Sequence, residues 1–342
     1  MRYRRLGRTG LLVSELCLGT NTFGGSGPPW DALGALDQPA CNAVMRAAFD
    51  GGVNFLDTAD IYGAGDSERR IGQGLRELGI DRSALVIASK VGGRTGSGIN
   101  ESGSSRAHLT RALDASLARL GTDYLDLLML HFPDPATPLD ETLSTLDDFV
   151  RAGRIRYIGC SNYPAWLTMQ AVEISRAHAW ARFAVQESHW SAATRDVERE
   201  LVPMARAAGI GLLVWGPLLG GLLAGKYDGG AGEGEGRTGG RPHPAIDPDR
   251  LRAAIGALRE VAAARSLPIP QVALAWVLAH REVSSVLFGA RNAEQVKANL
   301  GATGILLSEA EIALIDAAAP PLPSYGEAAV EAGSRERLVH AG

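Results

Sequence analysis

The chain has 342 residues, with 34 basic against 38 acidic side chains and a formal net charge of -4. Apolar residues make up 46% and charged residues 21%, a balance that excludes a mainly disordered chain. The lack of a basic run argues against nucleic acid as the principal partner, and the lack of a long uninterrupted apolar stretch argues against a membrane.

The cysteines and the N-terminal residues indicate in which cellular compartment the protein works. Cys17, Cys41 and Cys160 form no CxxC pair, so they offer neither a disulfide framework nor a cysteine zinc site. The N-terminus lacks the apolar core of a secretory signal. These features predict a cytoplasmic protein, and nothing in the sequence requires a metal.

Short apolar runs alternate with helical segments along most of the chain, after an N-terminal hairpin that turns near 7–10. Eight runs of strand length, several of them rich in β-branched or aromatic residues, are predicted as strands: 16–20, 54–58, 85–90, 124–131, 156–161, 183–189, 211–217 and 283–289. Segments with helical periodicity follow them: 39–50, 67–78, 106–120, 139–152, 164–177, 196–208, 270–280 and 293–300, with an extra helix over 249–265.

This alternation predicts parallel strands that are buried on both faces. Two closures are compatible with it, an open doubly wound sheet and a (β/α)8 barrel. Polar residues follow the carboxyl ends of many different strands, which favours the barrel, because an open sheet gathers its site at one switch point. We therefore predict an α/β fold of the (β/α)8 TIM-barrel type, with a single domain over 1–342, a core of about 2–318 and a C-terminal tail over 319–342.

A glycine-rich insert, 218–248, follows the seventh predicted strand. Insertions of this composition on the site-bearing face of a barrel often close over the ligand, so we interpret it as a lid; a plain surface loop is the alternative.

Three successive predicted strands each deliver an ionisable residue to one end of the barrel. Asp57, Lys90 and His131 lie at these strand ends, and Tyr62 follows Asp57 by five residues. A buried lysine needs a charge partner, for which Asp57 is the candidate. A nearby ammonium lowers the pKa of a phenol, so Tyr62 is predicted to exchange a proton with an oxygen that is becoming an alkoxide, while His131 orients that oxygen.

These four residues and several longer motifs resemble the aldo-keto reductase family. The motifs are NFLDTADIYGAGDSE, LLMLHFPD, IRYIGCSNYP and FGARNAEQVKANLGA, and the resemblance covers roughly residues 2–318. It is strongest to the branch with bacterial sugar and aldehyde reductases and potassium-channel β subunits. It implies a catalytic tetrad of Asp57, Tyr62, Lys90 and His131, and an NADP-dependent oxidoreductase that reduces an aldehyde or ketone, such as a sugar or nucleotide sugar, to an alcohol.

The resemblance also implies which residues bind the cofactor. Residues matching those beside the nicotinamide and its carboxamide are Thr20, Asn21, Asp57, Ser161, Asn162 and Gln186. Trp215 matches the aromatic residue that stacks on the nicotinamide ring. The turn under the pyrophosphate is matched by Gly216, Pro217, Leu218 and Gly220, and a lysine of the lid by Lys226. Residues matching the adenosine end are Gly289, Arg291, Gln295 and Asn299.

The residues themselves support one of these assignments. Arg291 lies where a predicted strand passes into a helix N-terminus, a position that suits a phosphate group. An arginine there favours NADPH over NADH, although a solvated helix-start residue is the alternative.

Several questions stay open at this stage. Trp30 is a candidate wall of the substrate pocket beside Tyr62 and His131, or else an exposed packing residue. The small-molecule carbonyl partner is undefined, and a homo-oligomer is compatible with the sequence. An NADPH-binding regulatory or scaffolding subunit with little turnover is the alternative function. An aldolase using Lys90 as a Schiff base is disfavoured, because Asp57 would keep the lysine charged.

Overall fold

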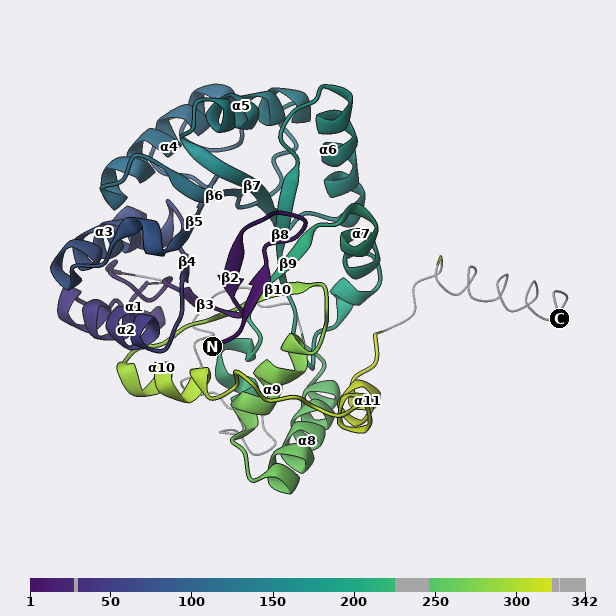
Figure 1. Ribbon diagram of the computed structural model, residues 1–342. Coiled ribbons are helices and arrows are strands. Elements are labelled where there is room, and N and C mark those ends of the chain that lie inside the picture. Colours follow the sequence, from purple (N-terminus) through teal and green to yellow (C-terminus); the bar gives the residue numbers. More distant parts are fainter. Residues whose placement is uncertain (28–29, 225–245, 322–325, 327–342) are drawn as a thin grey trace, which may run out of the picture.

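Eight parallel strands close into a barrel, which confirms the predicted (β/α)8 architecture (Figure 1). The computed structural model describes residues 1–27, 30–224, 246–321 and 326. Around the barrel, β10 precedes β3, and β4 to β9 follow in chain order. The strands are β3 (Leu16–Gly19), β4 (Phe55–Asp57), β5 (Val86–Val91), β6 (Leu125–Leu130), β7 (Ile155–Ser161), β8 (Phe183–His189), β9 (Gly211–Trp215) and β10 (Val283–Phe288).

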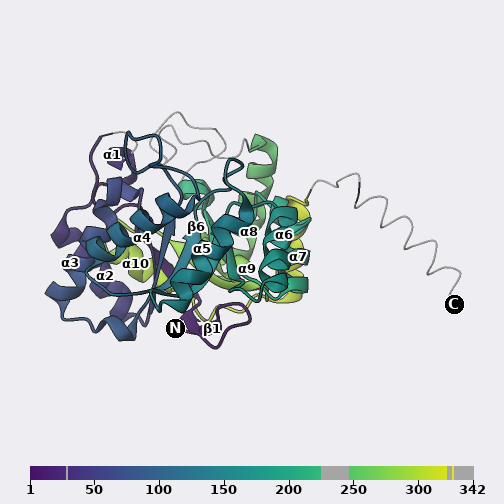
Figure 2. The ribbon, with the colours of Figure 1, turned by 90° about the horizontal axis from the view of Figure 1, so that it is seen from above.

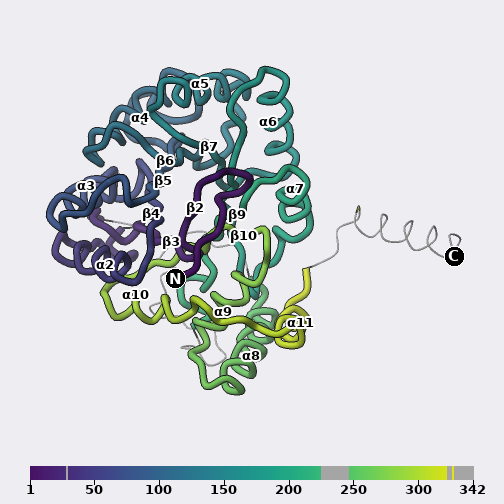
Figure 3. The backbone as a smooth tube through the Cα atoms, viewed as in Figure 1, coloured from purple at the N-terminus to yellow at the C-terminus, as the bar shows by residue number. Residues whose placement is uncertain are grey.

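Helices surround the barrel on its outer side, as the backbone trace shows (Figure 3). The helices of the described chain are α1 (Trp30–Leu33), which lies at one end of the barrel, and α2 (Gln38–Asp50), α3 (Asp66–Leu78), α4 (Arg106–Leu120), α5 (Leu139–Arg151), α6 (Ala165–Ala177), α7 (Leu201–Ala208), α8 (Pro248–Arg265), α9 (Ile269–Leu278), α10 (Ala293–Leu300) and α11 (Glu309–Ala318). The helix predicted over 196–208 is divided into a 3₁₀ turn at Asp196–Glu198 and α7. The helix α11 was not predicted.

Side-chain caps explain where several helices begin. Asp37, Ser105 and Asn292 each accept a hydrogen bond from a backbone amide in the first turn of α2, α4 and α10. These amides have no partner inside the helix, so a capping oxygen stabilises the start by about 1 kcal/mol.

The N-terminal hairpin closes one end of the barrel. Its strands, β1 (Tyr3–Arg5) and β2 (Leu12–Ser14), pair antiparallel. Leu6 and Val13 are fully buried and pack into the same cluster as the residues that fill the barrel interior. The hairpin and α1 lie at opposite ends of the barrel (Figure 2), so the hairpin leaves the carboxyl ends of the strands open to a site.

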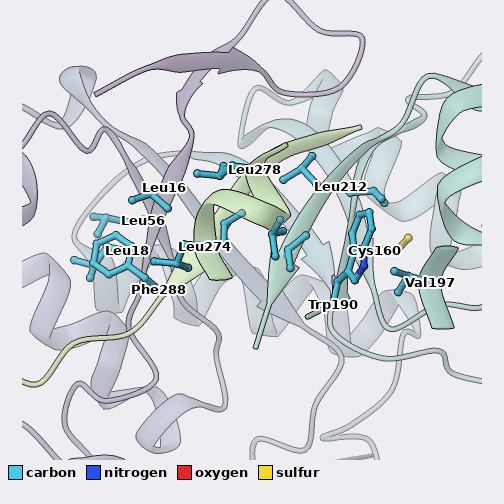
Figure 4. Close-up of a cluster of buried hydrophobic side chains, with 14 of the residues drawn as sticks. Leu16, Leu18, Leu56, Cys160, Trp190, Val197, Leu212, Leu274, Leu278 and Phe288 are labelled. Atoms are coloured by element: carbon cyan, nitrogen blue, oxygen red, sulfur yellow. The ribbon is translucent and has the colours of Figure 1, made fainter. Parts of the chain in front are cut away.

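Alternation along each strand separates two hydrophobic cores. Cys17, Phe55 and Val185 belong to the cluster inside the barrel. Their strand neighbours belong to the larger cluster between the sheet and the helices, where Leu16, Leu18 and Leu56 lie near the α9 residues Leu274 and Leu278 (Figure 4). Successive side chains of a strand point to opposite faces. Residues two positions after an interior residue therefore also face inward, and these include Asp57 and Glu187.

Among the described residues, no single helix is long and apolar enough to cross a bilayer. The pair α8 and α9 reaches that length and composition only together, with a bend of 103° between the two helices.

Candidate active site

A fully buried lysine forms the centre of the candidate site. The Lys90 ammonium, on β5, donates hydrogen bonds to both Asp57 carboxylate oxygens, at 2.7 and 2.6 Å. It also lies 3.3 Å from the Tyr62 hydroxyl and 3.3 Å from the Thr58 carbonyl oxygen. The adjacent strands β4 and β5 hold the pair in register, with Asp57 beside Ala88. The predicted partnership of Lys90 with Asp57 is therefore present in the structure.

A tight turn brings Tyr62 over this pair. The residues Tyr62–Gly65 form a 3₁₀ turn between β4 and α3, in which Gly63 has a φ of 56°. A Cβ at Gly63 would lie 3.0 Å from the Gly25 backbone, so only glycine fits without displacement. The turn places the Tyr62 hydroxyl on the Lys90 ammonium and exposes part of its ring to the rim.

Aromatic rings flank Tyr62 on two sides. Its ring packs edge-on against Trp30, with centroids 6.2 Å apart, and against His131, at 5.7 Å. His131 in turn stacks in parallel on Phe132 at 4.3 Å. The structure thus brings Tyr62, Lys90, Asp57 and His131 together, and it places Trp30 beside them.

A cavity of about 560 Å³ opens next to this row of rings. Trp30 and Phe132 form walls of the cavity, with Ile61 and Gly93 between them. Its polar lining comes from Asp60, Arg94, Thr95 and Arg119. Apolar walls with a few polar groups are typical of small-molecule sites.

A second carboxylate reaches Lys90 from the opposite side of the barrel, and the sequence analysis missed it. Glu187, on β8, is 3% exposed, and its Oε2 lies 3.3 Å from the Lys90 ammonium. Burial raises the pKa of Glu187 to about 8; the charge of Asp57 adds to this rise and Lys90 opposes it.

Burial also decides the acidity of Tyr62. Removal from water raises the pKa of the Tyr62 phenol to about 12, although the Lys90 ammonium works in the opposite direction. The negative charges of Asp57 and Glu187 raise it further. The sequence-based expectation of a net lowering by Lys90 is therefore wrong in this structure, because desolvation outweighs the cation. Tyr62 remains protonated at neutral pH.

Lys90 itself stays charged. Burial alone would lower its pKa, but the charges of Asp57 and Glu187 raise it well above its ordinary value. A charged lysine cannot act as a nucleophile, so this environment opposes the Schiff-base alternative.

Residues matched to the carboxamide and ring-stacking positions meet at the ends of β7 and β9. The Asn162 side chain accepts a hydrogen bond from the Trp215 indole, at 3.1 Å. It donates to the His131 carbonyl oxygen, at 3.1 Å, and to the Ser161 hydroxyl, at 2.9 Å. Ser161, Asn162 and Trp215 are therefore linked to the loop that carries His131.

Gln186 and Thr20 are turned away from the rim. Gln186 is fully buried, donates to the Tyr163 carbonyl oxygen at 2.6 Å and accepts from Thr168 of α6 at 2.9 Å. Its side chain lies on the outer face of β8, while the neighbouring Glu187 faces inward. Thr20 is buried and donates to the Asp57 carbonyl oxygen at 2.8 Å, and Asn21 follows it, half-buried. These internal bonds oppose a carboxamide contact by Gln186.

The turn matched to the pyrophosphate follows β9. Gly216 and Gly220 have φ angles of 68° and 64°, and Pro217 and Leu218 lie between them. Of the glycine-rich insert 218–248, the structure describes 218–224 and 246–248. Lys226 lies outside the described residues, as does most of the proposed lid.

Residues matched to the adenosine end lie together where β10 passes into α10. The Arg291 amide donates to the Gln295 side-chain oxygen at 2.8 Å, and the Asn299 amide group donates to the Gly289 carbonyl oxygen at 3.4 Å. The Arg291 guanidinium donates to the carbonyl oxygen of Ala32, a residue of α1, at 2.9 Å. Arg291 itself is exposed at the start of the helix.

A closed (β/α)8 barrel with these groups at its carboxyl rim defines an enzyme-type barrel site. The chain belongs to the aldo/keto reductase family, whose model matches residues 15–320. Family membership defines the protein as an oxidoreductase of a family that generally uses NAD(P)H.

Relatives with known names cover most of the chain. An aldo-keto reductase of Alternaria alternata is 34% identical, over 90% of this chain and 89% of its own length. The norsolorinic acid reductase of Aspergillus flavus is 33% identical, over 91% and 79%. A probable voltage-gated potassium channel subunit beta of Arabidopsis thaliana is 34% identical, over 90% and 92%. The reductase relatives support carbonyl reduction.

Proposed function

We propose that this protein is an NADPH-dependent oxidoreductase that reduces an aldehyde or ketone to an alcohol, with Tyr62 as the proton donor. The observation that carries the proposal is the 3.3 Å distance between the Tyr62 hydroxyl and the buried Lys90 ammonium, which Asp57 holds in place. His131 packs against the same phenol ring.

In this reaction each side chain of the site has a separate role. The bound cofactor supplies the hydride for the substrate carbon. Tyr62 donates its proton to the carbonyl oxygen as negative charge develops there. Lys90 stabilises the phenolate that forms, and Asp57 holds the ammonium in position. His131 orients the carbonyl oxygen, while Trp30 and Phe132 exclude water from one side of the site.

The chemistry of the donor groups fits a dinucleotide. Ser161 and Asn162 carry the hydroxyl and amide groups that suit a carboxamide, and they adjoin the flat Trp215 ring. Arg291 adds a guanidinium at the N-terminus of α10, where backbone amides and the helix dipole favour an anion. Its fork of donors suits a 2′-phosphate, which is why we propose NADPH rather than NADH.

The cavity indicates the substrate class. Its aromatic walls, together with the polar groups of Asp60, Arg94, Thr95 and Arg119, suit a carbonyl compound with an aromatic body and polar substituents, and some relatives are named norsolorinic acid reductases. Purified protein is expected to consume NADPH, followed by its ultraviolet absorbance, in the presence of members of an aldehyde and ketone panel. Absence of turnover with every member would contradict the proposal.

Replacing Arg291 with alanine is expected to raise the Kd for NADPH by about 10–100-fold, because charge-assisted hydrogen bonds to a phosphate contribute about 1.5–3 kcal/mol. The Kd for NADH should change little, since NADH lacks the 2′-phosphate. Titration of the intrinsic tryptophan fluorescence with each cofactor measures both constants.

The matched control is Lys297→Ala, which removes an exposed cation from the last turn of the same helix. It should leave both constants within about twofold of the wild-type values, since the helix C-terminus repels rather than attracts anions. Equal weakening of NADPH and NADH binding by Arg291→Ala would remove Arg291 from phosphate recognition.

A nicotinamide-binding subunit with little turnover is the second candidate function. It is favoured by the relatives named as probable potassium channel β subunits. Such a subunit would bind NADPH tightly and would show carbonyl reduction close to the uncatalysed rate, so the same panel distinguishes the two functions.

A further inference from the structure

The barrel interior holds an acidic group for which the proposed mechanism has no use. Glu187 enters from β8, across the barrel from Asp57, and its Oε2 lies 3.3 Å from the Lys90 ammonium. A single ammonium therefore lies between two buried carboxyl groups, Asp57 at 2.6 Å and Glu187, with the Tyr62 hydroxyl as a further neighbour.

The charge of this group of side chains is not balanced if every acid is ionised. Asp57 and Glu187 would carry two negative charges against one positive charge on Lys90, in a region with almost no exposed surface. An uncompensated buried charge is costly, so one of the two carboxyl groups retains its proton. Asp57 makes two short bonds to the ammonium and Glu187 makes one longer contact, so the proton belongs on Glu187.

We propose that Glu187 is a positioning residue for carbonyl reduction: its neutral form keeps Lys90 on Tyr62, and its ionisation causes the loss of activity at alkaline pH. The proposal rests on the proposed function of Tyr62 as the acid. It goes beyond that function because it assigns the pH limit of the reaction to a side chain other than Asp57, Tyr62, Lys90 and His131.

The protonation state of Glu187 acts on the acidity of the Tyr62 phenol. Ionised Glu187 attracts the ammonium and adds a negative charge that raises the pKa of Tyr62, so the phenol becomes a weaker acid. Burial raises the pKa of Glu187 to about 8, which places this change within the working range of an enzyme.

Asp57 shares the ammonium with Glu187 and has a pKa that burial also raises, whereas the other titratable groups that face Glu187 titrate outside this range. The titratable groups from β3, β4 and β5 are Cys17, Asp57 and Lys90. Burial raises the pKa of the Cys17 thiol well above its usual value, and Lys90 remains charged. The cross-strand neighbours on β7 and β9 are Ser161 and Leu213, and neither carries an acid or a base.

The first test is the pH dependence of kcat/KM in Glu187→Gln. In wild-type protein, kcat/KM for a carbonyl substrate should fall by about tenfold per pH unit above about pH 8. The glutamine variant keeps the shape of the side chain but cannot ionise. The alkaline limb of its pH profile, the range in which kcat/KM falls, should therefore shift to higher pH by at least about one pH unit. Glu187→Asp keeps an ionisable group and should retain an alkaline limb.

The matched comparison is Asp60→Asn. Asp60 is also buried, lines the neighbouring cavity, and has a pKa raised by burial to about 8. Its backbone amide donates to the Lys90 carbonyl oxygen at 3.0 Å, but its carboxyl group forms no ion pair with the Lys90 ammonium in the described structure, so its replacement by asparagine should leave the alkaline limb of the pH profile where it is. A limb that moves in Asp60→Asn but not in Glu187→Gln would overturn the proposal. A uniform loss of kcat/KM at every pH in Glu187→Gln would mark a structural role only, with the same consequence.

The second test needs neither cofactor nor substrate. A carboxyl group whose pKa is higher in the folded than in the unfolded chain stabilises the fold at low pH, and this stabilisation is lost as the pH rises toward the folded pKa. Between about pH 5.5 and 7.5, the free energy of urea unfolding should fall with pH, and Glu187→Gln should reduce that slope by one proton equivalent. Equal slopes would show that Glu187 holds no extra proton, which contradicts the proposal.

The two tests separate failure of this inference from failure of the proposed function. A reduced unfolding slope with an unmoved alkaline limb refutes the role of Glu187 and leaves Tyr62 as the acid. Full activity in Tyr62→Phe refutes the proposed function, and with it the catalytic role of Glu187.

Discussion

Replacing Tyr62 with phenylalanine is expected to lower kcat for carbonyl reduction by about 10²–10⁴-fold, the usual contribution of a positioned acid. The variant loses only the hydroxyl that lies 3.3 Å from the Lys90 ammonium. The ring should stay in place, because it packs between Trp30 and His131. The Kd for NADPH should therefore change little. Single-turnover oxidation of bound NADPH by a saturating carbonyl substrate measures the effect on the chemical step.

Tyr124→Phe is the matched control for this experiment. Tyr124 precedes β6 at the opposite end of the barrel, where its ring lies under the guanidinium groups of Arg82 and Arg156. Loss of that hydroxyl should leave kcat within about twofold of wild type, as is usual for surface changes away from a site. A Tyr62→Phe protein as active as the control would show that another group supplies the proton.

The fold could be predicted because strand and helix signals alternate regularly. Each predicted strand overlaps an observed one, and no end differs by more than two residues, which is within the usual uncertainty of boundaries. The helix α11 was missed although its sequence carries a signal. Ser308 and Glu311 form a reciprocal capping box, a serine followed three residues later by glutamate, and this pattern marks a helix start.

The four residues proposed as catalytic, Asp57, Tyr62, Lys90 and His131, could be predicted to lie together because each lies at or just after a strand end, where a barrel gathers its site. Glu187 was missed although strand alternation contains the information. Val185 faces the barrel interior, so Glu187 must face inward and Gln186 outward. The resemblance directed attention to Gln186, whose amide is bonded to Tyr163 and Thr168 instead.

The sign of the Tyr62 pKa shift could not be predicted from the sequence. The sequence identifies Lys90 as a cation near the phenol, and that effect is present with the expected direction. The dominant cause is burial, which depends on how Trp30, His131 and the barrel rim enclose the ring. Such enclosure is a property of the closed fold and not of any local motif. A phenol that stays protonated suits the donor role better than a partly ionised one.

Replacing Lys90 with methionine is expected to destabilise the protein by about 3–5 kcal/mol near neutral pH, because it leaves the Asp57 charge buried without its partner. It should also lower kcat on the order of 10²–10³-fold, the effect of removing one group that stabilises charge in the transition state. Urea unfolding measures the first effect and steady-state NADPH consumption the second. The exposed pair Arg106–Asp148 provides the control, since Arg106→Met should cost only about 0–1 kcal/mol.

The destabilisation by Lys90→Met should depend on pH in a definite direction. Burial raises the pKa of the Asp57 carboxyl, and the variant removes the cation that opposes this rise. The stability contributed by the protonated carboxyl is present at low pH and is lost as the pH rises, so the deficit should be smaller at about pH 5 than at about pH 8. Adding Asp57→Asn should recover much of the stability at the higher pH without recovering activity, since the charges of Lys90 and Asp57 are then both removed. A deficit that is equal at both pH values, or that the double variant does not reduce, would show that the lysine stabilises the barrel by packing and not by its charge.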